Sequence, residues 1–437
     1  MVQSTAQKSE PTVRESKPHI LTLPTESARA DRDPHSYERW LVAKLLRMTG
    51  SPPVRFQLWN GEVIESDNRN IDFTLHLADP KALFSLVANP NLAFGDLYSA
   101  GRIRVDGELP DLMESLYRSV HAARQKWPKW LDAFWRNHNP RSTGIPEAKE
   151  NIHHHYDLGN DFYRLWLDQA AMQYTCAYYE RPDLTLEQAQ LAKLEHVCRK
   201  LRLKPGMRVV EAGCGWGGLA RYMASHFGVT VDSYNISREQ LVYAREQARK
   251  EGLEKLVNYI EDDYRNISGQ YDAFVSVGML EHVGKENYPE LSEVIKRSLK
   301  PNGIALLHSI GRNRPTLMNT WIEKRIFPGA YPPGIGELVA ICEQGGFSVI
   351  DVENLRLHYA QTLSHWRERF TTHESEVTDM YDEHFVRAWH MYLAGSIAAF
   401  RVGSLQLFQV VFTHEGNNQL PRNRHDLYTF PAAPERT

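Results

Sequence analysis

The sequence predicts an α/β protein in which a doubly wound, mostly parallel sheet follows a smaller N-terminal α+β domain. Three observations predict this fold. Short apolar runs alternate with helical patterns from residue 208 to about residue 350. A glycine-rich turn, residues 213–218, ends the first of these runs, while residues 36–116 mix brief strands and helices. Ligands bind at the carboxyl ends of parallel strands. We therefore expect the ligand-binding site after residue 212, where the first strand ends, and at the ends of the neighbouring strands.

The composition excludes several classes of protein. The chain has 437 residues, 42% apolar and 24% charged, with a formal net charge of -3, so a nucleic-acid-binding surface is not indicated. Four scattered cysteines without a CxxC pair argue against a disulfide framework or a structural zinc site and indicate a reducing, cytoplasmic setting. Apolar runs stay below the roughly 18 residues of a spanning helix, so we expect membrane contact to be peripheral.

Changes in composition divide the chain into four parts. Residues 1–34 are polar and predict a disordered tail, residues 35–120 form the N-terminal domain, and residues 146–437 form a larger C-terminal domain. The linker between them, residues 121–145, interleaves cations with tryptophans. This pattern suits an anionic membrane surface, or an interdomain helix that Pro128 interrupts.

Periodicity predicts the individual elements. In the N-terminal domain we expect strands at 54–59 and 73–77 and a helix at 82–87, followed by a helix or turn, a strand and a turn over 95–107. A capping box of Thr185 and Gln188 begins a helix. We then expect strands at 208–212, 229–235, 257–260, 271–278, 304–310, 347–350 and 405–412, with a turn at 301–303. Helices are expected at 237–250, before Leu299, near Leu338, and over 362–370 and 389–401.

Three consecutive histidines, His153 to His155, raise the question of a metal. Neighbouring residues on one element do not converge as i, i+4 pairs do, so we expect no metal site.

The glycine-rich turn predicts a nucleotide-shaped cofactor. Gly213, Gly215 and Gly218 satisfy the dinucleotide pattern GxGxxG, but the second strand ends at Asn235 with no acid for a ribose. The acid Glu211, just before the first glycine, is expected to face the ligand. A carboxylate there suits a positively charged cofactor without phosphates, as in S-adenosylmethionine.

Two further positions keep two interpretations each. Asp263 and Tyr264, after the third strand, would meet an adenine, although Asp263 also suits a turn. Gln240 would either contact the cofactor or complete a capping box with Ser237.

Five motifs together resemble the cyclopropane-fatty-acyl-phospholipid synthases, a bacterial family of class I S-adenosylmethionine methyltransferases. They are Glu-Ala-Gly-Cys-Gly-Trp-Gly-Gly (211–218), Tyr-Thr-Cys-Ala-Tyr-Tyr (174–179), Tyr-Asn-Ile-Ser-Arg-Glu-Gln (234–240), Val-Gly-Met-Leu-Glu-His-Val-Gly (277–284) and Leu-His-Ser-Ile-Gly (307–311). The resemblance runs from about residue 151 to about residue 428.

The resemblance implies a reaction on lipid. A methylene unit would pass from S-adenosylmethionine to the cis double bond of unsaturated acyl chains in membrane phospholipids, with a bound bicarbonate ion accepting the proton. It also implies a homodimer, a lipid-engaging N-terminal domain, and a peripheral position on the inner face of the cytoplasmic membrane. The alternatives are a methylene or branched acyl product, a methyltransferase or dinucleotide oxidoreductase of small molecules, and a non-catalytic lipid-binding scaffold.

The resemblance also implies the site residues. Those that would hold the bicarbonate are Cys176, Glu281, His308, Ile310 and Tyr359. Those that would bind the cofactor, beside Glu211, are Tyr174, Thr175, Gly213, Gly215, Asn235, Ile236, Gln240, Asp263, Tyr264 and Arg265. Five aromatic residues are candidates for lining an acyl tunnel, although core packing is the simpler interpretation of each: Trp321, Phe327, Trp366, Tyr392 and Phe400.

Overall fold

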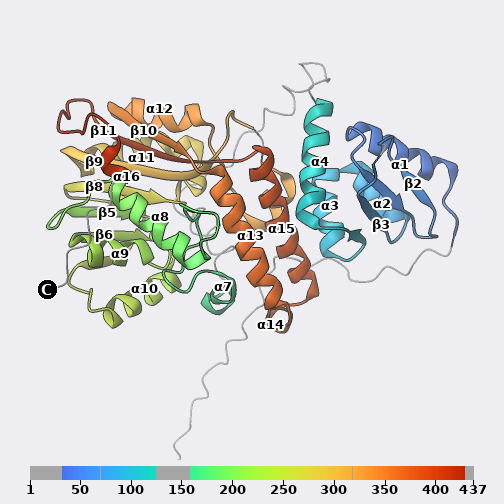
Figure 1. Ribbon diagram of the computed structural model, residues 1–437, viewed down its shortest axis with the longest axis horizontal. Helices are drawn as coiled ribbons and strands as arrows, with labels where there is room; N and C mark the ends of the chain where they lie inside the picture. The colour runs from blue at the N-terminus through green and yellow to red at the C-terminus, as the bar shows by residue number, and fades with distance from the viewer. Residues whose placement is uncertain (1–31, 69, 125–157, 317, 429–437) are drawn as a thin grey trace, which may run out of the picture.

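A computed structural model describes residues 32–68, 70–124, 158–316 and 318–428, and in them the chain forms two separate sheets (Figure 1). Most of the expected tail, nearly all of the basic aromatic linker and the three consecutive histidines lie outside the described residues.

The N-terminal domain is a four-stranded sheet with helices packed against it. Its strands lie in the order β2-β1-β3-β4, with β1 parallel to β3 and the other pairs antiparallel. The expected elements at 54–59, 73–77 and 82–87 are confirmed, whereas β2, three residues long, was not predicted. The elements are α1 (Ser36–Met48), β1 (Val54–Gln57), β2 (Val63–Glu65), β3 (Phe73–Leu77), α2 (Pro80–Ala88), α3 (Pro90–Ser99), β4 (Ile103–Asp106) and α4 (Leu109–Arg124).

The larger sheet has seven strands in the order β10-β11-β9-β8-β5-β6-β7. Because β11 is antiparallel to both of its neighbours while the pairs from β9 to β7 are parallel, the expected mostly parallel sheet is confirmed. The strands are β5 (Arg208–Ala212), β6 (Thr230–Asn235), β7 (Val257–Glu261), β8 (Tyr271–Val277), β9 (Leu299–Gly311), β10 (Phe347–Asn354) and β11 (Gln406–His414).

Helices cover both faces of this sheet, as the alternation along β5 shows. Val209 packs in one apolar cluster with residues of α8, α9 and α10, and Val210 packs in another with residues of α11 and α12. The sheet is therefore doubly wound. The helices are α7 (Asn160–Trp166), α8 (Leu186–Lys200), α9 (Gly218–Phe227), α10 (Arg238–Lys250), α11 (Tyr288–Ser298), α12 (Ile335–Gly345), α13 (Arg356–Thr372), α14 (Glu374–Met380), α15 (Glu383–Val402) and α16 (His425–Tyr428). The predicted capping box of Thr185 and Gln188 is present at the start of α8.

The prediction of a turn at residues 301–303 was wrong, because these residues lie within β9. Tyr271 pairs with Leu299 and Ala273 with Ile304, so the register shifts and the residues between form a bulge. Pro301 is tolerated there because a bulged residue donates no hydrogen bond to the ladder.

Two long helices, α13 and α15, lie between the two sheets (Figure 1). α15 packs against α13 on the catalytic side and against α3 and α4 of the N-terminal domain. The ring of Trp321 packs directly on Gly95 of α3: a Cβ on Gly95 would lie 2.5 Å from Trp321 Cδ2, too close for any side chain. Among the described residues no helix, α15 included, combines the length and apolar character needed to cross a membrane.

Candidate active site

The glycine-rich turn leaves the backbone open at the carboxyl end of β5. Gly213 and Gly215 have φ values of +84° and +52°, a region that side chains other than glycine rarely adopt. A Cβ on Gly213 would lie 2.9 Å from Met279 Cβ, whereas a Cβ on Gly215 would meet no atom within 4 Å. Close packing on one side and open space on the other make this turn a cradle into which a ligand can approach the backbone.

Glu211 lies beneath this turn and points to the neighbouring strand. Its side chain is buried, and its carboxylate accepts a hydrogen bond from Ser233 Oγ at 2.5 Å. Burial raises the pKa of Glu211 to about 7. The carboxylate thus supports the strand behind the turn, and its expected contact with a cofactor stays a prediction.

Asn235 and Gln240 face each other beside the turn. Asn235 Nδ2 donates to Gln240 Oε1 at 2.9 Å and to Gly215 O at 3.2 Å. Ser237 caps α10 by accepting from the backbone of Gln240, while the Gln240 side chain points to Asn235 and does not complete a capping box. Gln240 therefore belongs to the site edge, with half-buried Ile236 beside it.

The turn after β7 uses its acid locally. Asp263 accepts from the backbone N–H of Arg265 at 2.9 Å and from its guanidinium at 3.1 Å. Arg265 also pairs with Glu290, and its guanidinium lies 4.9 Å from the ring centroid of Tyr264. The turn role of Asp263 is confirmed, while the adenine contacts of all three residues stay predictions.

Glu281 follows β8 and His308 lies on the neighbouring strand β9, and these two residues define the seam. Ile310 N–H donates to Glu281 Oε1 at 2.6 Å, and Gly278 N–H donates to the carbonyl of His308 at 2.9 Å. Glu281 Oε2 and His308 Nε2 are both buried and have no hydrogen-bond partner among the described residues. An unpartnered buried polar atom costs about 1–3 kcal/mol, so this seam is chemically incomplete as it stands.

Burial sets the charge of both groups. It raises the pKa of Glu281 to about 7 and lowers the pKa of His308 well below its usual value. With Gln409 Nε2 donating to His308 Nδ1 at 3.1 Å, the imidazole is neutral and carries its hydrogen on Nε2. His308 thus keeps one N–H donor, and Glu281 one carboxyl oxygen, without a partner among the described residues.

Cys176 and Tyr359 lie on the α13 side of the site. Cys176 Sγ is 3.9 Å from the carbonyl oxygen of Leu355, and the backbone N–H of Tyr359 donates to the same oxygen at 3.2 Å. Burial raises the pKa of Cys176, so the group is a neutral thiol. The fold therefore brings these two predicted residues together at the start of α13.

Aromatic rings pack in a row beside Tyr359, called the aromatic wall here. The ring centroids of Tyr174 and Trp366 are 5.3 Å apart, and those of Trp366 and Tyr359 are 5.9 Å apart. The hydroxyl oxygens of Tyr174 and Tyr392 are 3.0 Å apart. The five aromatic residues proposed for an acyl tunnel, Trp321, Phe327, Trp366, Tyr392 and Phe400, all belong to one hydrophobic cluster or pack against it. Core packing is confirmed, and the tunnel stays a prediction.

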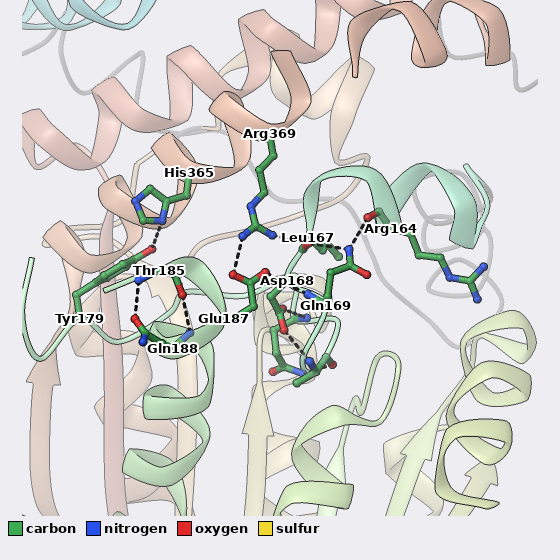
Figure 2. A network of polar contacts seen from close by, with 12 residues as sticks. Arg164, Leu167, Asp168, Gln169, Tyr179, Thr185, Glu187, Gln188, His365 and Arg369 are labelled. Carbon is green, nitrogen blue, oxygen red and sulfur yellow. Dashed lines mark hydrogen bonds and ion pairs between the residues drawn. The ribbon is translucent and has the colours of Figure 1, made fainter. Parts of the chain in front are cut away.

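The polar residues that hold the loop before α8 were not predicted from the sequence. Figure 2 shows Asp168, Gln169, Glu187 and Arg369 joining this loop to α8 and α13, with Arg369 donating to Glu187 at 2.7 Å. Gln190 and Lys193 belong to the same loop support and are fully buried. Their signal was available, because both interrupt the apolar stripe of α8.

A cleft of about 900 Å³ lies elsewhere, between the N-terminal domain and the start of α15. Its lining mixes both charges and includes Trp59, Arg102, Arg104, Asp382, Glu383 and Arg387. None of the predicted site residues lines it.

A seven-stranded sheet with one reversed strand, and a glycine cradle after the interior strand β5, define a class I S-adenosylmethionine-dependent methyltransferase. Residues 145–410 match the family described as mycolic acid cyclopropane synthetase, and residues 41–126 match a domain of unknown function. The chain belongs to the mycolic acid cyclopropane synthetase family.

Individual relatives agree with this assignment. A probable fatty acid methyltransferase of Pseudomonas putida is 33% identical over 390 residues, covering 86% of this chain and 96% of the relative. The cyclopropane-fatty-acyl-phospholipid synthase of Escherichia coli K12 is 46% identical over 267 residues, covering 61% and 68%. The solved structure of mycolic acid cyclopropane synthase CmaA1, complexed with SAH and CTAB, superposes with a TM-score of 0.57 at 30% identity, covering 60% and 97%.

Proposed function

We propose that this methyltransferase adds a methylene unit to the cis double bond of an unsaturated acyl chain in a membrane phospholipid, giving a cyclopropane. The name of the E. coli relative supports the substrate and the product. The observation that carries the proposal is the incomplete seam, where Glu281 Oε2 and His308 Nε2 are buried and unpartnered among the described residues.

The cradle fits the cofactor. We propose that Gly213 and Gly215 bring the backbone to S-adenosylmethionine, with Tyr174, Thr175, Asn235, Gln240 and Tyr264 around it. When bound, this cofactor supplies an electrophilic methyl group. An alkene is a weak nucleophile, so the surrounding residues must orient it and exclude water.

A small anion with its own hydroxyl would complement the two groups of the seam. His308 Nε2–H can donate to the anion, and the Glu281 carboxyl group, with a pKa of about 7, can exchange a hydrogen with it. We propose bicarbonate as this guest, with Cys176 and Tyr359 on its far side. The proton lost from the acyl chain would leave toward the seam, while the aromatic wall stabilises positive charge on the chain.

Product analysis tests the reaction. Purified enzyme, unsaturated phospholipid vesicles and labelled S-adenosylmethionine should give a fatty-acid methyl ester heavier by one CH₂, without olefinic NMR signals. Unchanged fatty acids would refute the proposal.

A second candidate product is a methylene or branched acyl chain. The P. putida relative, which covers most of this chain, is described as a fatty acid methyltransferase without mention of a ring. This product also gains one CH₂ but keeps an olefinic NMR signal, so the same experiment distinguishes the two.

The N-terminal domain presents an aromatic patch, defined here as Tyr37, Trp40 and Phe84. Their exposed fractions are 51%, 53% and 42%, although aromatic side chains are usually covered. Tyr37 stacks on Phe84 with 6.3 Å between ring centroids, and Lys44 Nζ lies 4.7 Å from the Trp40 ring. We propose that this patch rests on the lipid headgroups of the inner face of the cytoplasmic membrane, since aromatic rings beside a cation suit that interface.

Vesicle sedimentation tests the patch. Replacing Tyr37, Trp40 and Phe84 by serine should reduce binding to anionic phospholipid vesicles at least tenfold without changing affinity for S-adenosylhomocysteine. Val242→Ser is the matched control, since Val242 is 57% exposed on α10 of the catalytic domain. Unchanged vesicle binding by the triple variant would refute the lipid role, and loss of a homodimer in its place would assign the patch to dimerisation.

A further inference from the structure

Lys193 is a fully buried cation that touches the site through neutral partners. It lies on α8 with 0% exposure, and its ammonium donates to Gln173 Oε1 and, at 3.0 Å, to Thr175 Oγ1. Among the described residues no carboxylate lies within ion-pair distance of Lys193 Nζ. Because burying a cation costs several kcal/mol without compensation, these two contacts and the charges around them are what retain it.

The partners of Lys193 belong to one strip of chain, the roof segment, defined here as residues 171–176. Asp168 accepts from the backbone N–H groups of Ala171 at 2.7 Å and Gln173 at 2.6 Å (Figure 2). Gln190, one turn before Lys193, donates to the carbonyl of Thr175 at 2.8 Å. Backbone and side chains of the roof segment are therefore anchored from α8 and from the loop before it.

The roof segment lies against both glycine positions that border the cradle. A Cβ on Gly218 would lie 2.2 Å from the Ala171 carbonyl oxygen, and a Cβ on Gly278 would lie 2.8 Å from Thr175 Cγ2. The segment thus spans from the start of α9 to the end of β8. The segment therefore connects the start of α9, the end of β8 and Cys176.

We propose that Lys193 is a positioning residue: through Gln173 and Thr175 it sets the roof segment over the cofactor cradle. It would act on Tyr174 and Thr175, which contact the cofactor in the proposed function on which this inference rests, and on Cys176. It would not itself touch substrate.

Burial lowers the pKa of Lys193 to about 8, while coulombic attraction to Asp168 opposes that shift, so the ammonium stays mostly protonated at neutral pH. The cation in turn helps to lower the pKa of His308 on β9. The charge of Lys193 therefore acts on the seam as well as on the roof segment.

The test compares two buried lysines of α8. Lys193→Met should weaken binding of S-adenosylhomocysteine, measured by calorimetry, at least tenfold and raise KM for S-adenosylmethionine similarly, with KM for lipid vesicles within twofold of wild type. Lys200→Met is the control. Lys200 is 1% exposed but pairs with Glu353 and Asp351 of β10, away from the roof segment. The affinity of this variant for S-adenosylhomocysteine should therefore stay within twofold of wild type. Equal affinity in Lys193→Met and wild type, or equal loss in both lysine variants, would overturn the inference.

A second pair of variants keeps Lys193 in place. Thr175→Val retains the methyl group against Gly278 and removes the hydroxyl that accepts from Lys193, so the affinity should fall several-fold. Thr175→Ser restores the hydroxyl and should recover most of that loss. Equal affinities in this pair would overturn the inference even if Lys193→Met fails to fold, whereas absence of binding by the wild type would refute the proposed function itself.

Discussion

Glu281 is a carboxyl group whose burial sets both its chemistry and its contribution to stability. Burial raises its pKa from 4.5 to about 7, and the backbone N–H of Ile310 keeps one oxygen occupied. A raised pKa means that the folded state favours the protonated form. The associated stability is present below the unfolded pKa and is lost as the pH rises through about 7.

Glu281→Gln should separate catalysis from stability. The amide oxygen can still accept from Ile310, so stability at pH 4, below the unfolded pKa of 4.5, should match the wild type. At pH 8 the variant should be more stable by about 3 kcal/mol, because each pKa unit corresponds to about 1.4 kcal/mol. Urea unfolding midpoints of the ligand-free proteins at both pH values measure this.

The same variant should lose most turnover while keeping its affinity for S-adenosylhomocysteine, since the residue lies at the seam and not at the cradle. Cys176→Ser should be milder, because a hydroxyl can still donate to an anion. Near-wild-type turnover by Glu281→Gln, or a stability difference that does not change with pH, would contradict these roles.

At the scale of elements, the cradle depends on how closely α9 begins against the roof segment. Gly218 is the first residue of α9, and an added Cβ would lie 2.2 Å from a backbone oxygen and 2.7 Å from Gln173 Nε2. The backbone oxygen cannot rotate away. The contact between α9 and the roof segment therefore tolerates no side chain.

Gly218→Ala should weaken affinity for S-adenosylhomocysteine at least tenfold, because the roof segment must move off the cradle. Gly336→Ala is the matched control: Gly336 lies in the first turn of α12, and its Cβ would meet nothing within 4 Å. That substitution should leave affinity unchanged. Calorimetric titration of both variants checks the prediction, which fails if they bind alike.

At the scale of the whole molecule, the two sheets are joined through α15 and the residues beside it (Figure 1). Arg325 makes two hydrogen bonds of 3.0 Å to the Asp96 carboxylate of α3. Both side chains are largely covered, whereas the pair of Arg401 with Asp111 of α4 is open to solvent. A covered bidentate pair contributes more to stability than an exposed single contact.

Asp96→Ala should therefore loosen the N-terminal domain. We expect a loss of about 1–3 kcal/mol from the interface, seen in calorimetry as an earlier or separate unfolding step. Asp111→Ala, which removes the exposed pair, should change stability by less than about 1 kcal/mol. Equal effects of the two variants would show that the covered pair does not couple the domains.

Much of the fold could be predicted from local pattern. The alternation of strands and helices and the glycine cradle depend on near neighbours in the chain, so periodicity and turn chemistry were sufficient. The prediction at residues 301–303 failed because a proline and glycine in a bulge have the same local pattern as a turn. Only the pairing of β8 with β9 distinguishes the two.

The candidate site divides in the same way. The sequence by itself determined the cradle, its expected cofactor class and, through the family motifs, the candidate site residues. The tertiary structure decided that Glu281 Oε2 and His308 Nε2 are each buried without a hydrogen-bond partner among the described residues, that the Gln240 side chain accepts from Asn235, and that Lys193 donates to Thr175 of the roof segment. These outcomes follow from burial and from contacts between residues far apart in the chain, which desolvate charges and orient side chains in ways that no local pattern records.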